Sequence, residues 1–240
     1  MNPKWYHTWW GVVVLSFLLL LCAGVVFFVG TTIRYWWQIK HGITPAFLKE
    51  NTAQFTVSTQ AQGGEVDRAS LETADSPWLG RFGATTTIVE FIDFKCPNCQ
   101  IAASTVHLLD AQFHDRVRII VRHFPAETLH PGATELSILG YCAQKQNKFW
   151  PLYDILFNQQ SNLPNPLDSA TINNLADAVG LKLTDLTACM KSPSANAAVT
   201  RDYLDGVRAG VRGTPTYFVN GEKVEGVIPV NLWTGFLSSH

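Results

Sequence analysis

The 240-residue sequence lacks an excess of charge of either sign, and charged residues are scarce. Its 18 lysines and arginines nearly balance its 19 aspartates and glutamates, so the net charge is -1, and charged residues make up only 15% of the chain. Proteins that bind nucleic acid usually carry a strongly basic patch. The composition therefore argues against nucleic acid as a partner, and the absence of internal repeats argues against a solenoid.

Charge is missing altogether from residues 11–30. Twenty helical residues span roughly 30 Å, which is the thickness of the hydrocarbon core of a bilayer. Aromatic residues, which favour membrane interfaces, flank this segment on both sides: Trp5, Tyr6, Trp9, Trp10, Tyr35, Trp36 and Trp37. We predict a flank over residues 1–10 and a transmembrane helix in the lipid bilayer over residues 11–33. A cleaved signal peptide fits less well, because the segment is long and no A-x-A-like site follows it.

The rest of the chain divides into a linker and one domain. Residues 34–77 mix Thr, Gln, Ser and Gly with little periodicity, as linkers do. Residues 78–240 are numerous enough to bury a core of their own. Their pattern predicts a strand, a helix, a second strand, a helical block at about 126–210, then a hairpin and a last helix. This order predicts an α/β, thioredoxin-like fold with a helical insertion.

The motif Cys96-Pro97-Asn98-Cys99 directly follows the first predicted strand. Two thiols at the start of a helix can open and close one disulfide, which is redox chemistry. Pro97 suits the first helical position, so we expect Cys96 at the N-cap, where the helix terminus lowers its pKa. Half of a zinc site is the alternative. No second CxxC completes four ligands, so we predict no metal and no other cofactor.

Thr214-Pro215 precedes the strand expected at residues 216–219. Proline is also tolerated at the first residue of an ordinary strand, and this is one interpretation. The other is a cis peptide bond that packs against the CxxC motif. The backbone of Thr214 would then be free to pair with an extended substrate segment.

Glu90 is an acid in the middle of an otherwise apolar strand, six residues before Cys96. Alternation places it with Ile88 and Ile92 on one face, where an unpaired carboxylate is costly. Its proton would serve Cys99, or the carboxylate would be hydrogen-bonded for structural reasons. Both interpretations stay open from the residues alone.

Two further cysteines, Cys142 and Cys189, fall on apolar helix faces inside the helical block. They are either two buried thiols or partners in a structural disulfide. Disulfides persist outside the cytosol, so an external domain favours the bridge. Basic residues are more numerous after the predicted span than before it, which favours the opposite orientation. We expect the domain outside the cytosol because of its redox chemistry.

Several ordered motifs together resemble the DsbA family of bacterial thiol-disulfide oxidoreductases. The resemblance covers about residues 78–237 and leaves out the predicted span and linker. It is carried by four segments: Val89 to Cys99, Arg122-His123-Phe124-Pro125, Lys148-Phe149-Trp150 and Gly213-Thr214-Pro215-Thr216.

The resemblance implies an extracytoplasmic enzyme that oxidises folding proteins by disulfide exchange. It assigns the nucleophile to Cys96, its buried partner to Cys99, the cis-proline to Pro215 and the buried acid to Glu90. The implied partners are thiol-containing unfolded proteins and a membrane partner that re-oxidises or reduces the enzyme. Asn98 departs from the best-known oxidase, which has histidine there, so isomerase and reductase activity stay open. A tethered chaperone or binding module without redox turnover is the alternative from another class.

Overall fold

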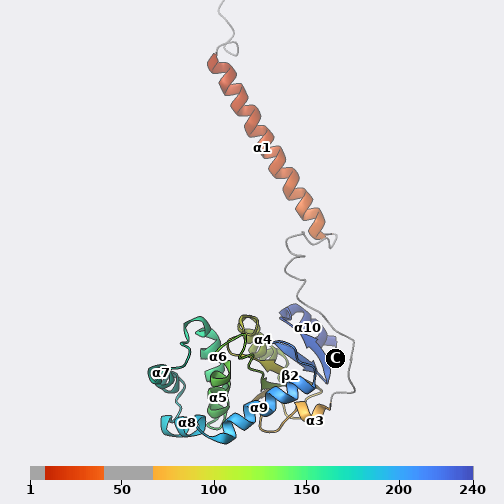
Figure 1. The fold of residues 1–240 in the computed structure, drawn as a ribbon. Helices are drawn as coiled ribbons and strands as arrows, with labels where there is room; N and C mark the ends of the chain where they lie inside the picture. Colours follow the sequence, from red (N-terminus) through yellow and green to blue (C-terminus); the bar gives the residue numbers. More distant parts are fainter. Residues whose placement is uncertain (1–8, 41–66, 240) are drawn as a thin grey trace, which may run out of the picture. The chain divides into compact units, whose positions relative to one another are not determined.

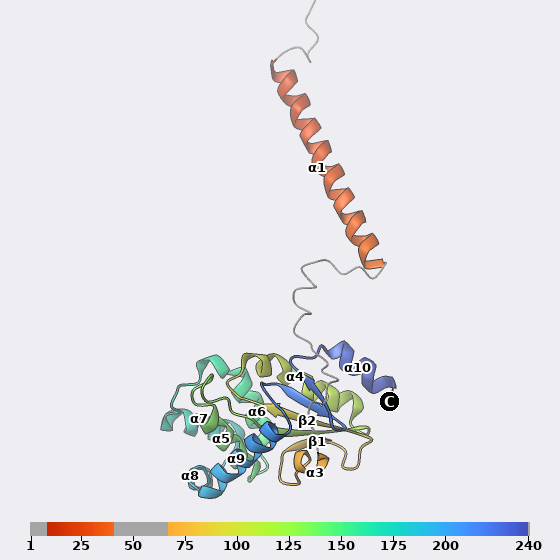
Figure 2. The same cartoon turned by 45° about the vertical axis from the view of Figure 1, so that its right-hand side comes forward.

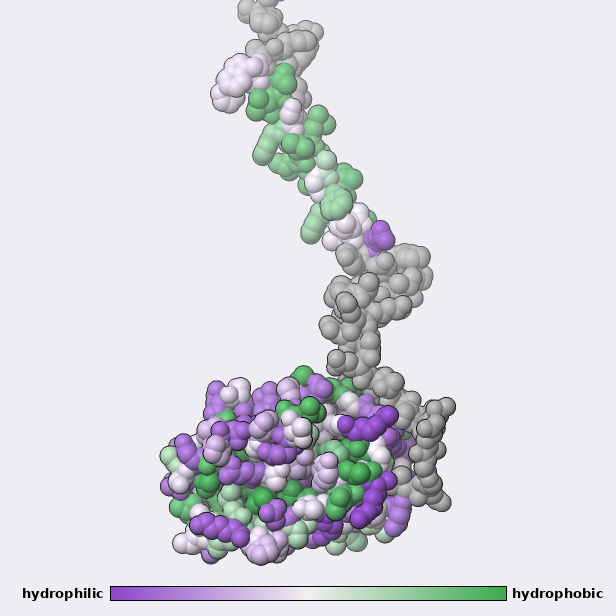
Figure 3. All heavy atoms as spheres, in the orientation of Figure 1, coloured by the Kyte–Doolittle hydropathy of each residue, from purple (hydrophilic) through white to green (hydrophobic). Residues whose placement is uncertain are grey.

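The computed structural model describes residues 9–40 and 67–239, and the chain divides into two units, residues 1–53 and 54–240. The first unit contains the 32-residue helix α1 (Trp9–Lys40), drawn in red and orange in Figure 1. Apolar side chains such as Leu20 and Phe27 are exposed along it (Figure 3). The segment expected over residues 11–33 is therefore helical. Within the two described ranges, however, no helix meets the length and apolarity required of a membrane span.

The second unit is built on a five-stranded sheet of order β1-β3-β2-β4-β5. Its strands are β1 (Trp78–Gly80), β2 (Thr86–Ile92), β3 (Val117–His123), β4 (Thr216–Val219) and β5 (Glu222–Glu225). β2 and β3 are parallel, and the other pairs are antiparallel. All seven residues of β2 are buried, as expected of a continuous apolar run covered on both faces.

Helices cover both faces of this sheet (Figure 2). On one face, α4 (Pro97–Phe113) and α10 (Val230–Ser239) pack on Ile88, Ile119 and Tyr217. On the other face lie α3 (Arg68–Leu71) and α9 (Pro193–Arg208). α9 approaches closely at Gly206, where a Cβ atom would lie 2.7 Å from the Phe124 ring. A larger residue would therefore push this helix off the sheet.

α3 lies inside the segment expected to be linker, which was 34–77. Leu71 is 1% exposed and packs in the core with Val89, Phe91 and Ile120. One apolar residue followed by a polar stretch has no periodicity, so the sequence pattern did not reveal it. α1 also continues to Lys40, beyond the expected end of the span at residue 33. The remainder of the expected linker, residues 41–66, lies outside the described residues.

The helical insertion between β3 and β4 is confirmed. It contains α5 (Ala133–Gln144), α6 (Phe149–Asn158), a 3-10 turn η2 (Gln160–Asn162), α7 (Ser169–Val179), α8 (Leu183–Met190) and α9. These bounds agree with the expected 126–210. The fold is therefore a mixed α/β, thioredoxin-like fold with a helical insertion.

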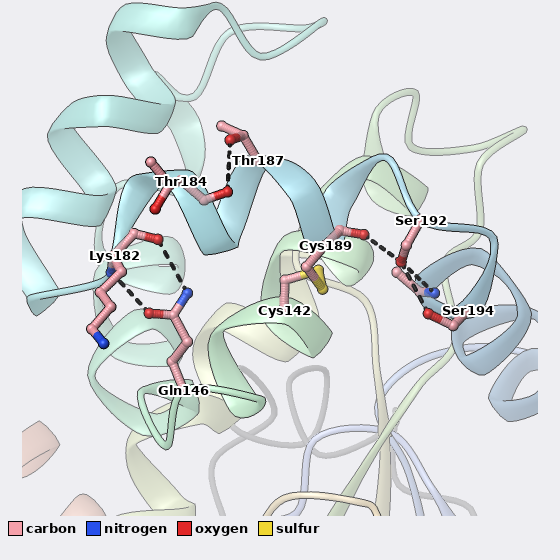
Figure 4. The surroundings of a disulfide bond; sticks show 9 residues. Cys142, Gln146, Lys182, Thr184, Thr187, Cys189, Ser192 and Ser194 are labelled. Carbon is pink, nitrogen blue, oxygen red and sulfur yellow. Dashed lines mark hydrogen bonds between the residues drawn. A yellow bond between two sulfur atoms is a disulfide. The ribbon is translucent and has the colours of Figure 1, made fainter.

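A disulfide joins α5 to α8 within the insertion (Figure 4). Cys142 and Cys189 are bonded with an S–S distance of 2.02 Å, so they form the favoured bridge rather than two free thiols. In the turn just after α5, the Gln146 side chain pairs with the backbone of Lys182, the N-cap residue of α8. Lys182 N donates to Oε1 at 2.8 Å, and Nε2 donates to Lys182 O at 3.3 Å. The covalent bond and the two hydrogen bonds fix α8 against α5.

Replacing both bridge cysteines by alanine should lower the free energy of unfolding by about 4 kcal/mol, because the bridge closes a loop of roughly 48 residues in the unfolded chain. Urea unfolding of the Cys142→Ala/Cys189→Ala protein measures this. Gln146→Ala, which breaks only the neighbouring hydrogen bonds, is the control and should cost about 1 kcal/mol. A double variant that loses no more than the control would contradict the prediction.

Candidate active site

Cys96 occupies the N-cap of α4, as the sequence predicted. Its backbone is extended (φ -74°, ψ 121°), and Pro97 follows at the first helical position. Cys96 is 6% exposed and Cys99, one turn inside the helix, is 1% exposed; both are free thiols. One sulfur therefore lies at the rim of the fold and the other beneath it.

The loop before β4 faces this sulfur. The Thr214–Pro215 peptide bond is cis. The Cys96 thiol donates a hydrogen bond to Thr214 O, with Sγ and O 3.2 Å apart. The Thr216 hydroxyl donates to Gly213 O at 2.7 Å and holds the turn. The structure thus brings together the two elements, 118 residues apart, that the sequence singled out.

The two thiols differ sharply in acidity. A hydrogen bond from the Cys99 thiol lowers the pKa of Cys96 to about 5. Burial opposes this shift, while the Thr214 side chain and the backbone amides of Cys99 and Asn98 add to it. Burial, followed by the neighbouring Cys96, raises the pKa of Cys99 well above its usual value. The sequence argument attributed the low pKa to the helix terminus alone. Its amides contribute, but the partner thiol contributes most.

Glu90 is fully buried in β2, directly opposite Tyr217 of β4. Neither of its oxygens has a hydrogen-bond partner of good geometry among the described residues. Burial raises the pKa of Glu90 to about 8, and the Tyr217 hydroxyl nearby offsets this in part. Burial also raises the phenol pKa of Tyr217 and Tyr153, and the charges of Glu90 and Cys99 add to both shifts. A neutral, polar cluster therefore lies below Cys99.

Asp93 organises the loop that leads to Cys96, and the sequence analysis missed it. Its carboxylate is fully buried. It accepts hydrogen bonds from Lys95 N at 2.8 Å and Ala126 N at 2.9 Å, and it contacts His130 Nδ1 at 2.7 Å. An acid between a buried strand and the CxxC motif was a usable signal, because a buried carboxylate needs such partners.

Four histidines downstream of the CxxC motif, His107, His114, His123 and His130, were the possible partners of the thiols in the alternative zinc site. Within the described parts of the chain, no group of three or more His, Cys, Asp or Glu side chains could hold a metal. Three of them contact aspartates instead: His107 with Asp154, His114 with Asp110 and His130 with Asp93. His123 is buried, and burial lowers its pKa to about 4.

A cavity of about 500 Å³ with both apolar and polar lining residues lies next to the segment that leads into the cis-proline loop. It is formed by the segment after β3, by α9 and by the residues just before Gly213; its lining includes Phe124, Leu129, Tyr203, Val207 and Arg212. Leu129 is 77% exposed. Part of the cavity lining is therefore an exposed apolar side chain, as in many binding surfaces.

A CxxC pair at the start of a helix, facing a cis-proline loop on a thioredoxin-like sheet, defines the class of thioredoxin-fold proteins. A family model described as thioredoxin matches residues 72–238. The chain belongs to this thioredoxin family.

Solved structures with the same fold include DsbA-type proteins, which agrees with the fold that the resemblance implied. A thioredoxin-like oxidoreductase from Silicibacter pomeroyi DSS-3 is 24% identical with a TM-score of 0.62, and the match covers 72% of this chain and 96% of that one. Wolbachia pipientis alpha-DsbA1 is 19% identical with a TM-score of 0.62, covering 70% and 92%. BdbD from Bacillus subtilis is 20% identical with a TM-score of 0.59, covering 69% and 92%.

The curated relatives are much longer proteins, and this chain matches only a part of each one. The Na(+)/H(+) antiporter NhaA of Herminiimonas arsenicoxydans is 31% identical over 156 residues, which are 65% of this chain and 24% of the antiporter. NhaA 1 of Mycolicibacterium vanbaalenii is 32% identical over 149 residues, with 61% and 24% covered. The chain thus spans about a quarter of the length of these relatives.

Glu90→Gln should change how stability depends on pH. In the folded protein the Glu90 pKa is about 8 against an ordinary 4.5. The unfolded chain therefore releases this proton first, and wild-type stability falls as pH rises from 4.5 to 8. Relative to Glu90→Gln, the loss should approach at most about 1.4 kcal/mol per pH unit.

Urea unfolding between pH 4.5 and 8 measures this difference. Glu222→Gln is the matched control, because Glu222 is exposed on β5. The Glu222→Gln curve should run parallel to wild type. The same behaviour of Glu90→Gln would show that Glu90 ionises normally.

Proposed function

We propose that this protein is a membrane-anchored, extracytoplasmic thiol-disulfide oxidoreductase that forms disulfides in folding proteins through Cys96 and Cys99. The observation that carries the proposal is the unequal thiol pair. Cys96 has a pKa of about 5 and its sulfur lies 3.2 Å from Thr214 O, while Cys99 is buried and its pKa is raised. Only the Cys96 sulfur is therefore accessible to a thiol of another protein.

The first step begins from the oxidised Cys96–Cys99 pair. A substrate thiolate attacks the sulfur of Cys96, forms a mixed disulfide with it, and displaces Cys99 as a thiolate. Glu90 holds a proton at neutral pH because its pKa is about 8. The Cys99 thiolate is more basic still, so transfer of a proton from the Glu90 cluster to Cys99 is favourable.

The second step releases the product. A second thiolate of the substrate attacks the substrate sulfur of the mixed disulfide, which forms the new substrate disulfide and expels Cys96 as a thiolate. Two substrate thiols have then lost two electrons, and the enzyme pair has gained them. The low pKa of Cys96 makes it a good leaving group in this step. Re-oxidation requires a disulfide or quinone-linked acceptor, which we assign to a membrane partner.

Substrates are proposed to bind as extended, thiol-containing segments of unfolded or partly folded proteins. The Thr214 carbonyl lies beside the reacting sulfur, where the backbone of an added strand would pair. The cavity lined by Leu129, Tyr203 and Val207 would take an apolar side chain of the same segment.

The stabilised Cys96 thiolate favours an oxidase over a reductase of the same fold. Each pKa unit by which the thiolate is stabilised makes the disulfide more oxidising by roughly 30 mV. A chaperone or binding module would have no use for two thiols of such different acidity. Isomerase and reductase activity are the alternatives that an assay of this protein has to distinguish from oxidase activity.

The full-length protein should refold reduced, denatured RNase and reduce insulin, and Cys96→Ser should abolish both activities. Cys22→Ser is the matched control, because Cys22 is exposed in the first unit and lies outside the pair. A redox potential of the pair well above the roughly -270 mV of thioredoxin would mark an oxidase. A wild-type protein no more active than Cys96→Ser in both assays would contradict the proposed enzyme activity.

Membrane attachment is the part of the proposal that rests on the sequence alone. Residues 11–30 carry no charge, so the wild-type protein should stay in the membrane pellet after alkaline extraction. Leu20→Arg/Val25→Arg should move it to the supernatant, since each central arginine costs about 2.5 to 3.5 kcal/mol. Thr52→Arg in the expected linker is the control. A soluble wild type, or a domain protected from protease added to intact cells, would contradict the anchor or its orientation.

A further inference from the structure

The active-site segment, residues 94–100, is tied to the C-terminal end of α6 and the turn η2 that follows it by hydrogen bonds from side chain to backbone. Lys95 Nζ donates to Leu163 O at 3.2 Å, and Gln100 Nε2 donates to Phe157 O at 2.7 Å. In the opposite direction, Gln160 Nε2 donates to Phe94 O and to Cys96 O, both at 3.0 Å. Among the described residues of the insertion, Gln160 is the side chain that reaches the backbone of the nucleophile itself.

Gln160 is placed for this role by the end of α6. It is the first residue of the turn η2 and is only 8% exposed. Its carboxamide nitrogen donates to two carbonyls, that of Phe94, two residues before Cys96, and that of Cys96 itself. Cys96 O also accepts from Gln100 N at 3.1 Å. The backbone on both sides of the thiol is thereby fixed.

The contact has an electrostatic consequence. A carbonyl oxygen carries partial negative charge, and the carbonyl of Cys96 belongs to the same residue as the thiolate. Hydrogen bonds from the Gln160 carboxamide offset this charge, in a buried site where water does not replace them. The same bonds hold the extended backbone of the N-cap (ψ 121°), from which the sulfur reaches the first-turn amides and Thr214.

We propose that Gln160 is a positioning residue of the redox centre. By donating to the carbonyls of Phe94 and Cys96, it holds the Cys96 sulfur at the N-cap of α4 and stabilises the reduced form over the disulfide. This role rests on the proposed function and deepens it, because it makes the insertion part of the device that sets the oxidising strength of the pair.

A purely structural brace would behave differently. A brace lost from the core destabilises the oxidised and the reduced protein alike. A residue that stabilises the Cys96 thiolate acts mainly on the reduced form, because only that form contains the thiolate. By linkage, a change in the difference between the two stabilities equals a change in the redox equilibrium.

The test compares Gln160→Met with Gln159→Met in the full-length protein. Methionine keeps the length of glutamine and removes its donors, and Gln159 is the exposed neighbour of Gln160. Three quantities are measured: the equilibrium constant with glutathione, the pH midpoint of Cys96 alkylation by iodoacetamide, and the thermal midpoints of both redox forms.

For Gln160→Met we expect the glutathione equilibrium to move about 3- to 10-fold toward the oxidised protein. The alkylation midpoint, near 5 in the wild type, should rise by about 0.5 to 1 pH unit, since one unit is tenfold in the equilibrium. The gap between the thermal midpoints of the reduced and oxidised forms should narrow. Gln159→Met should match the wild type in all three.

An unchanged midpoint and equilibrium constant in a folded Gln160→Met protein would overturn the proposal and leave Gln160 as a brace. If this variant does not fold, Gln160→Glu, which keeps length and polarity, must show the shift in the same direction. Failure of both variants to fold would assign Gln160 to folding and also overturn the proposal. These readouts need only the Cys96–Cys99 pair and small reagents and no protein substrate, so an enzyme inactive on insulin and RNase would refute the proposed function and leave this result standing.

Discussion

The pairing of β2 with β4 is the constraint on which the site depends. The two strands are antiparallel, with Phe91 opposite Thr216 and Glu90 opposite Tyr217. The end of β2, which leads to Cys96, therefore lies beside the start of β4, which follows the cis Thr214–Pro215 bond. A shift of this register by one residue would turn the Tyr217 side chain to the other face of the sheet, away from Glu90. It would also carry Thr214 away from the sulfur.

Burial does most of the chemical work around this junction. It keeps Glu90 and Cys99 protonated by penalising their charged forms, while the less buried Cys96 gains hydrogen bonds that favour its thiolate. The protonated Cys99 and the Cys96 thiolate are thus held one turn apart at the start of the same helix. The cost is an acid without a partner of good geometry in the core, and a core built for stability alone would have an apolar residue there.

The sequence was sufficient for the features that have local signatures. Pro97 after Cys96 predicts the start of α4. The β-branched run at residues 86–92 predicts β2, and Asn220-Gly221 predicts the hairpin turn between β4 and β5. Features that depend on two distant segments were harder. The Cys142–Cys189 pairing stayed open because spacing does not show which helix faces meet. Asp93 has a local signal, its place between a buried strand and the CxxC motif, but two of its partners lie at residues 126–130. Gln160 has no such signal, because a buried amide is recognised only by its partners, here at residues 94–96.

The insertion and the redox centre share one core, which explains why a residue of the insertion can act on the thiol. Cys96, Cys99, Leu139 and Cys142 belong to the same buried cluster, and Phe94 packs in it against Phe149, Tyr153 and Phe157 of α6. Phe94 is also the residue whose carbonyl Gln160 holds. Dense packing transmits small displacements rather than absorbing them. A displacement of α6 should therefore also change the orientation of the active-site loop. The disulfide that fixes α8 to α5 limits such a displacement.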